Sequence, residues 1–86
     1  MKIKDIKHIE TNETRTDGKY PLRIGSTVEF LYEPIVGMGM NLFYILDNQG
    51  NPKSGCIRTS MVDNIVETDT EIVIVTKNSI YCLEKE

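Results

Sequence analysis

A chain of 86 residues has room for one domain with a small core, and its 40% hydrophobic and 27% charged residues exclude disorder of the whole chain. Thirteen acidic residues oppose ten basic ones and give a net charge of −3. Proteins that bind nucleic acid mainly by neutralising phosphates are basic, so this class is not favoured, although six basic residues against four acidic ones in residues 1–27 leave room for a local basic patch.

The first part of the chain carries weak structural signals. Residues 2–10 hold three isoleucines at intervals of three, a spacing that fits a short strand or one turn of helix: Ile3, Ile6 and Ile9. Residues 11–19 are polar and predict a loop. We expect residues 1–20 to form a polar N-terminal extension or long first loop, and loose ordering of this part stays open. Pro21 is expected to stop any helix, and residues 23–26 to form a turn that leads into a strand.

The rest of the sequence predicts short strands between turns. Alternating or continuous apolar runs indicate strands at residues 28–33, 41–46, 55–59, 64–68, 71–76 and 79–83. The segments between them are an apolar loop at 35–40, turns at 47–53 and 69–70, a 3₁₀-type turn at 60–62 that Ser60 can cap, and a two-residue hairpin loop at 77–78.

Five or six short strands at roughly ten-residue spacing predict a single all-β domain over residues 1–86. At this length a small closed barrel is favoured over a sandwich, because closure leaves fewer exposed strand edges.

Two of the predicted strands, residues 42–46 and 72–75, are apolar on both faces, whereas a strand of a small barrel needs only one apolar face. Two explanations stay open. The chain's own N-terminal segment covers the outer face, with its isoleucines packing across it, or this face is an interface with a second copy or another protein.

The apolar loop at residues 35–40 supports an interface. Methionine side chains adapt to many partners and glycines permit movement, although Met38 and Met40 can instead plug one end of the barrel. We predict a partner-binding surface formed by Tyr32, Met38, Met40, Phe43 and Tyr44.

The sequence shows no pattern that indicates a catalytic residue, a cofactor or a metal site. His8 has no cysteine near it in the sequence, and two distant cysteines do not have the spacing of a zinc site. Residues 37–39 begin like a dinucleotide-binding motif but lack its third glycine and its helix. The aromatic residues are not interleaved with basic ones along the chain, so nucleic-acid binding is an alternative and not the first expectation.

The expected location is the cytoplasm. Charged residues follow Met1 at once, and the longest apolar run, residues 42–46, is too short to cross a bilayer, so no membrane partner is expected. In such a chain Cys56 and Cys82 are expected to be reduced and buried, not joined in a disulfide.

The last third of the chain carries a resemblance. Arg58-Thr59-Ser60-Met61-Val62-Asp63-Asn64-Ile65, residues 72–76 and Asn78-Ser79-Ile80-Tyr81-Cys82-Leu83 resemble the C-terminal half of SH3-like barrels. This stretch, about residues 55–84, is also similar to a pattern in small uncharacterised proteins of Gram-positive bacteria and their phages. The resemblance implies structural roles only, with Val62 and Ile65 in the core, Ser60 as a turn cap, Asn78 in the hairpin loop, and Tyr81 and Leu83 in the closing strand. The clustered aromatic and acidic residues of proline-peptide binders are missing from the first loop, so that function is not implied.

The sequence thus predicts a non-catalytic protein-interaction or regulatory module that binds a protein partner or forms a homodimer. The alternatives are a nucleic-acid-binding barrel and a phage-type inhibitor or binder of a small ligand.

Overall fold

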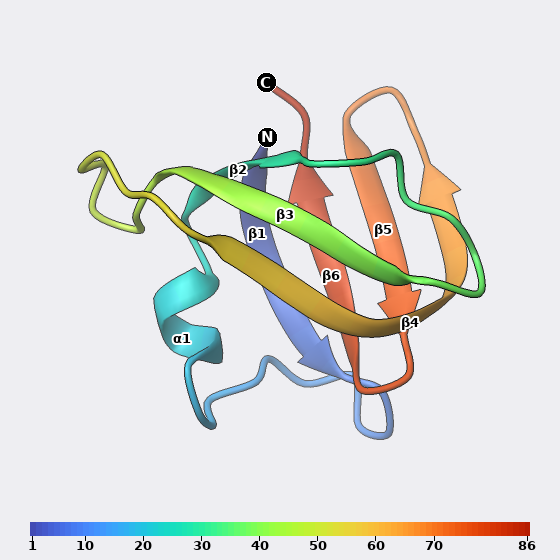
Figure 1. Cartoon of the computed structure of the whole chain (residues 1–86). Helices are drawn as coiled ribbons and strands as arrows, with labels where there is room; N and C mark the ends of the chain where they lie inside the picture. Colours follow the sequence, from blue (N-terminus) through green and yellow to red (C-terminus); the bar gives the residue numbers. More distant parts are fainter.

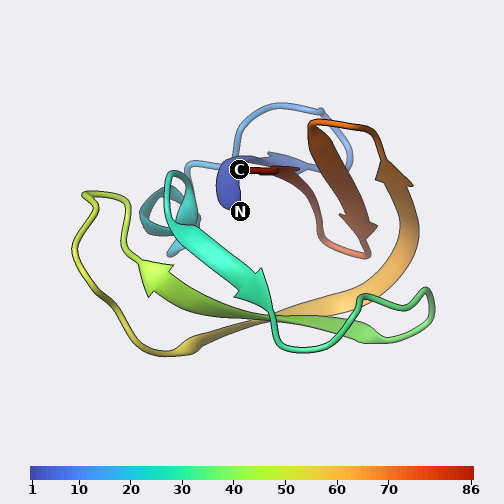
Figure 2. The same ribbon diagram turned by 90° about the horizontal axis from the view of Figure 1, so that it is seen from above.

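The structure is a computed structural model that describes residues 1–86. Six antiparallel strands follow one another around a closed barrel, and the last strand pairs with the first (Figure 1). The elements are β1 (Lys2–His8), α1 (Tyr20–Arg23), β2 (Thr27–Phe30), β3 (Gly39–Leu46), β4 (Cys56–Glu67), β5 (Glu71–Thr76) and β6 (Ser79–Glu84). The predicted all-β barrel is confirmed. The ring encloses the core, and the two chain ends lie side by side at one end of it (Figure 2).

The N-terminal segment is one of the strands that form the barrel wall, and it does not cover the outer face of the barrel. Ile3 and Ile6 have no exposed surface and belong to the core, whereas Ile9 is partly exposed. A β-bulge between Ile3 and Asp5 shifts the register against β6, so two isoleucines three residues apart both point inward. The bulge also explains why the spacing fitted no regular element. The expectation that these isoleucines pack across the outer face is therefore wrong.

β4 is one continuous strand where two strands and a 3₁₀ turn were expected. Its first part pairs with β3, its second part pairs with β5, and the pairing changes partner around Met61 and Val62. Register shifts on both sides of this point let the strand bend from one side of the barrel to the other, as Figure 1 shows. The Ser60 hydroxyl caps no helical turn and instead accepts a hydrogen bond from the Asn78 amide (3.2 Å).

The predicted tight turns are confirmed. β5 ends at Thr76 and β6 begins at Ser79, which leaves the two-residue hairpin loop at 77–78. In the turn after β3, a carboxylate oxygen of Asp47 accepts hydrogen bonds from two amides of the turn, and these bonds lower the pKa of Asp47.

Pro21 was expected to stop any helix, but it does not. It lies in the first turn of the four-residue helix α1, where the missing amide hydrogen has no partner within the helix in any case. This short helix places Tyr20 and Arg23 beside the barrel, where Tyr20 contacts Arg15 and Arg23 donates a hydrogen bond to Tyr81.

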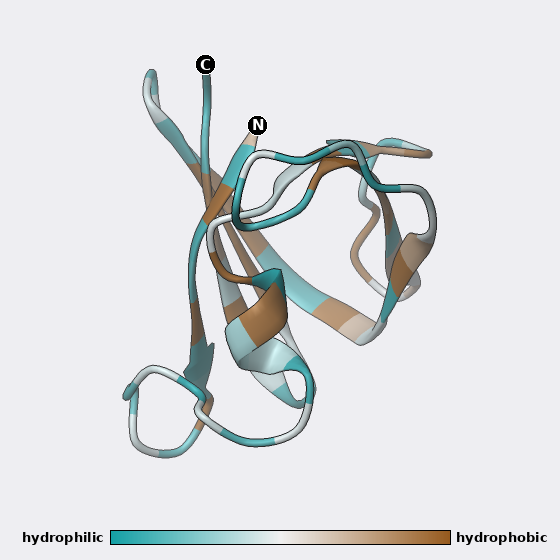
Figure 3. Ribbon diagram, turned by 90° about the vertical axis from the view of Figure 1, so that its left-hand side faces the viewer, coloured by the Kyte–Doolittle hydropathy of each residue, from teal (hydrophilic) through white to brown (hydrophobic).

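The core fills the ring with side chains from all six strands. Buried and more exposed positions alternate along β5 and β6. Hydrophobic stretches of the strands are brown in Figure 3. The buried hydrophobic residues are Ile3, Ile6, Val28, Met40, Leu42, Ile57, Val62, Ile72, Ile74, Tyr81 and Leu83.

The outer face of β5 and β6 keeps an apolar strip that no segment of this chain covers. Val73 pairs with Cys82 and Val75 pairs with Ile80, and all four side chains are partly exposed. Val66 on β4 lies beside Val73 and is 49% exposed. Cover by the N-terminal segment no longer explains the strands that are apolar on both faces. The other explanation, an interface with a second copy or another protein, remains a prediction. No helix of the protein has the length and apolar character needed to cross a membrane.

Candidate functional site

The loop between β2 and β3 presents a run of exposed apolar side chains. Their exposed fractions lie between 48% and 69%, and they come from eight consecutive positions of the chain. We call them the loop surface: Leu31, Tyr32, Ile35, Val36 and Met38.

The base of this loop is held firmly on the barrel. The Gly37 amide donates to the Val62 carbonyl (2.8 Å), and the Val62 amide donates back to the Met38 carbonyl (2.9 Å). A turn closes with the Met38 amide on the Ile35 carbonyl (3.2 Å), and Gly37 supplies the positive φ (96°) that the turn requires. The backbone is satisfied by these bonds, so the apolar side chains are left pointing outward.

A hollow of about 370 Å³ lies within this surface. It is lined by Tyr32, Pro34, Ile35 and Met38 together with Glu33, Gly39, Met40 and Asn41. Apolar walls with one carboxylate at the edge suit an apolar side chain of another protein.

The five residues predicted for partner binding do not form one surface. Tyr32 and Met38 lie together on the loop surface, and Met40 lies beneath them but is only 1% exposed, so its side chain offers almost nothing to a partner. Phe43 lies on the outer face of β3, paired with Glu29 and Cys56.

Tyr44 faces the opposite way from Phe43 and packs against the core. Burial raises the pKa of Tyr44, and the Lys53 ammonium lies 4.2 Å from its ring centre. We therefore keep only Tyr32 and Met38 of the original five in the candidate contact surface.

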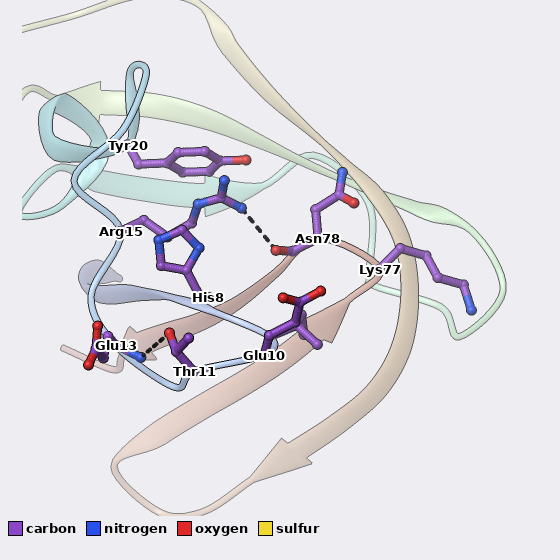
Figure 4. A pocket seen from close by; sticks show the side chains of 9 residues that line it. His8, Glu10, Thr11, Glu13, Arg15, Tyr20, Lys77 and Asn78 are labelled. Carbon is purple, nitrogen blue, oxygen red and sulfur yellow. Dashed lines mark hydrogen bonds between the residues drawn. The ribbon is translucent and has the colours of Figure 1, made fainter.

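The largest hollow, about 510 Å³, lies between the residue 9–19 loop and the hairpin at 77–78 (Figure 4). It is lined by His8, Ile9, Glu10, Thr11, Glu13, Arg15, Tyr20, Lys77 and Asn78.

Arg15 dominates this hollow, and its hydrogen bonds are already used by the protein. It donates to the Asn78 carbonyl and to the Ser79 hydroxyl, both at 2.9 Å, and the first of these bonds is drawn in Figure 4. Two further bonds, of 3.1 and 2.7 Å, reach the carboxylate of Asp17. The ring of Tyr20 lies 4.1 Å from the guanidinium. Arg15 thus fastens the long loop to the β5–β6 hairpin, a role that no motif in the sequence signals.

Asp17 is held in its charged form by this arrangement. The hydrogen bonds from Arg15 lower the pKa of Asp17 from 3.8 to about 2. His8 Nε2 lies 3.8 Å from the same carboxylate. The group is a structural clamp whose polar atoms satisfy one another.

Nowhere do three or more His, Cys, Asp or Glu side chains gather in a way that could hold a metal ion. Comparison with family models, with curated proteins and with solved structures finds no match to this chain.

Proposed function

We propose that the protein is a non-catalytic interaction module of the cytoplasm that binds another protein through the loop surface. The observation that supports this proposal is the run of five exposed apolar side chains on a loop whose backbone is anchored to β4. Exposed apolar residues scattered singly are ordinary, whereas a contiguous group of this kind is typical of an interaction site.

Tyr32 and Met38 are the expected anchors. Aromatic residues are enriched among the residues that contribute most to binding energy, and methionine adapts its shape to a partner. The fixed loop backbone adds to this, because little conformational freedom is lost when the loop is bound. Truncating either anchor is expected to weaken binding by about 1–2 kcal/mol, which is roughly tenfold.

Self-association is the second candidate, and a separate observation favours it. The uncovered apolar strip on β5 and β6, flanked by the exposed Val66, is a surface that a second copy can bury. A dimer formed there leaves the loop surface free for a different partner.

Co-purification from the native host tests the first candidate. We compare the wild-type protein with a Tyr32→Ser/Met38→Ser variant and with Val66→Ser as a matched control, since Val66 is similarly exposed but lies on β4. A partner that is lost with the double variant and retained with Val66→Ser supports binding through the loop surface. A partner retained by the double variant contradicts it.

The mass of the purified protein tests the second candidate. Light scattering that gives a dimer mass for the wild type and a monomer mass for Val73→Asp supports self-association through the strip. A monomer mass for the wild type at high concentration rejects it.

A further inference from the structure

Two small hollows adjoin on the side of the barrel that carries α1. The first, of about 150 Å³, is almost wholly polar and is lined by Tyr20, Arg23, Arg58, Thr59, Ser60, Thr76, Asn78, Ser79 and Tyr81. The second, of about 200 Å³, is lined by Lys19, Leu22, Arg23, Tyr44, Lys53, Cys56 and Ile57. Arg23 lines both, so they form one site, which we call the basic groove.

The charge of the basic groove is of one sign. Lys19, Arg23, Lys53 and Arg58 line it, and no acidic residue does. This is unexpected in a chain that has more acidic than basic residues. A hollow lined by charges of one sign attracts ions of the opposite sign, so an anion that neutralises these cations is expected to bind favourably.

None of these four cations forms a salt bridge with a carboxylate of the protein. The lysine and arginine salt bridges of the protein involve Lys4, Arg15, Lys77 and Lys85, which all lie outside the groove. The protein therefore pairs four of its other cations with its own carboxylates and leaves all four cations of the groove without one.

Arg23 is held in a fixed position at the junction of the two hollows. Its guanidinium donates a hydrogen bond to the Tyr81 hydroxyl (3.1 Å) and lies 5.2 Å from the centre of the Tyr20 ring. Tyr81 is 2% exposed, and burial raises its pKa, so this neutral hydroxyl is a rigid support. A guanidinium oriented in advance is well suited to a phosphate, because its planar fork matches two phosphate oxygens.

The two hollows differ in their lining, and this difference restricts the class of ligand that can fill both. The first offers arginines and hydroxyl groups, whereas the second combines two lysines with the apolar side chains of Leu22, Tyr44 and Ile57. A ligand that carries phosphates at intervals, with a flat apolar group between them, matches both. A single nucleic-acid strand has this chemistry. Its unstacked bases can enter a shallow apolar hollow, whereas the paired and stacked bases of a duplex cannot.

We propose that the basic groove binds the phosphodiester backbone of single-stranded nucleic acid, with Arg23 and Arg58 on one phosphate, Lys19 and Lys53 on the next, and a base against Tyr44 and Leu22. The sequence kept nucleic-acid binding only as an alternative, because the basic and aromatic residues that meet in the groove are not interleaved along the chain. Lys53 follows β3 and meets Tyr44 across the turn, while Arg23 reaches Tyr81 from α1.

Fluorescence anisotropy with a labelled oligothymidine at several salt concentrations tests the proposal. The variant is Lys19→Gln/Lys53→Gln, and the control is Lys2→Gln/Lys7→Gln, which removes the same charge from unpaired lysines of β1, outside the groove. Because each neutralised phosphate of a single strand contributes about 0.7 to the slope of log K against log salt, the two phosphates of the proposed site predict a slope of about −1.4. The variant is expected to bind about tenfold more weakly at low salt and with a slope that is about 0.7 smaller in magnitude, because Lys19 and Lys53 share one phosphate.

The control variant should keep the wild-type affinity and slope. All four lysines lack side-chain hydrogen bonds to the protein, so thermal unfolding by circular dichroism should be unchanged in the control. The Lys19→Gln/Lys53→Gln variant should melt only slightly lower, because it loses the contact of Lys53 with the Tyr44 ring. Equal weakening in variant and control overturns the proposal, because binding then follows net charge alone. Displacement of the oligothymidine by tripolyphosphate at equal phosphate concentration also overturns it, since the groove then recognises phosphate without a strand. An Arg58→Gln variant that binds like the wild type removes the first hollow from the site and contradicts the assignment of its phosphate.

Discussion

Replacing Arg15 by alanine should destabilise the protein strongly, although this residue lies in a polar loop far from the core. Its side chain is only 15% exposed and joins the residue 9–19 loop to the β5–β6 hairpin. The two hydrogen bonds to Asn78 and Ser79 contribute about 1 kcal/mol each. The exposed pair with Asp17 and the contact with the Tyr20 ring add about 0.5 kcal/mol each. The expected loss in the free energy of unfolding is therefore about 3 kcal/mol.

Urea unfolding followed by far-ultraviolet circular dichroism measures this loss. With a slope of about 1 kcal/mol per molar urea for a chain of this size, the midpoint should fall by about 3 M. Arg58→Ala is the matched control, because Arg58 is exposed and makes no salt bridge, and its midpoint should move by less than about 0.5 M. Arg15→Lys should lie between the two, since lysine keeps the charge but cannot form the planar fork.

A midpoint for Arg15→Ala that equals that of Arg58→Ala would refute this reasoning. It would mean that water replaces the four hydrogen bonds of the guanidinium without loss, and that the loop closes over the barrel for other reasons. Hydrogen exchange separates local from global effects, because the Arg15 amide bonds to the Ile6 carbonyl (2.8 Å) and should exchange faster once the clamp is gone.

Three further predictions concern pH, packing and thiol chemistry. The pKa of Asp17 falls from 3.8 to about 2 on folding, so the stabilising effect of this carboxylate is complete above pH 4 and disappears as the pH falls to 2. The difference in urea midpoint between the wild type and Asp17→Asn should therefore shrink between pH 4 and pH 2. A difference that stays constant over this range argues against the ion pair. Gly39→Ala should lower the free energy of unfolding by about 1–3 kcal/mol, because the new Cβ would lie 2.9 Å from the Thr59 carbonyl oxygen; an unchanged melting curve would show that β3 and β4 separate easily there. Ellman's reagent at pH 8 should modify the exposed Cys56 before Cys82, whose pKa is raised by burial, and urea should abolish the difference; equal rates in the native protein would contradict the burial of Cys82.

The strands of the C-terminal half could be predicted closely because local chemistry decides them. β5 occupies the expected residues 71–76, and β6 extends only one residue beyond the expected 79–83. The two-residue loop between them follows from the alternating apolar pattern and from an asparagine that tolerates turn geometry. In such segments the backbone and the core favour the same structure.

The errors arose where a bulge or a long-range contact decides the structure. The bulge in β1 brings Ile3 and Ile6 to the same face, and a spacing of three is otherwise incompatible with a strand. Met61 and Val62 were expected in a turn, but the bend of β4 is made by register shifts against two different neighbours, which no local pattern records. Met40 was assigned to the surface because the glycines beside it suggested a mobile loop. It instead begins the buried face of β3.

Closure of the barrel restricts where this protein can bind anything. The closed ring leaves only short stretches of strand edge unpaired, so binding is expected to use mainly loops and the outer faces of strands. The loop after β2 and the helix α1 lie on different sides of the barrel (Figures 1 and 2), which separates the loop surface from most of the basic groove. The two sites meet at Cys56, Arg58 and Thr59, which line the groove and also a hollow that includes Tyr32 and Met38. A protein bound over Tyr32 and Met38 would therefore contact one of the four cations of the groove. If both proposals hold, an acidic group of the protein partner at Arg58 would compete with nucleic acid, and Arg58→Gln should uncouple the two binding events while Lys53→Gln should not.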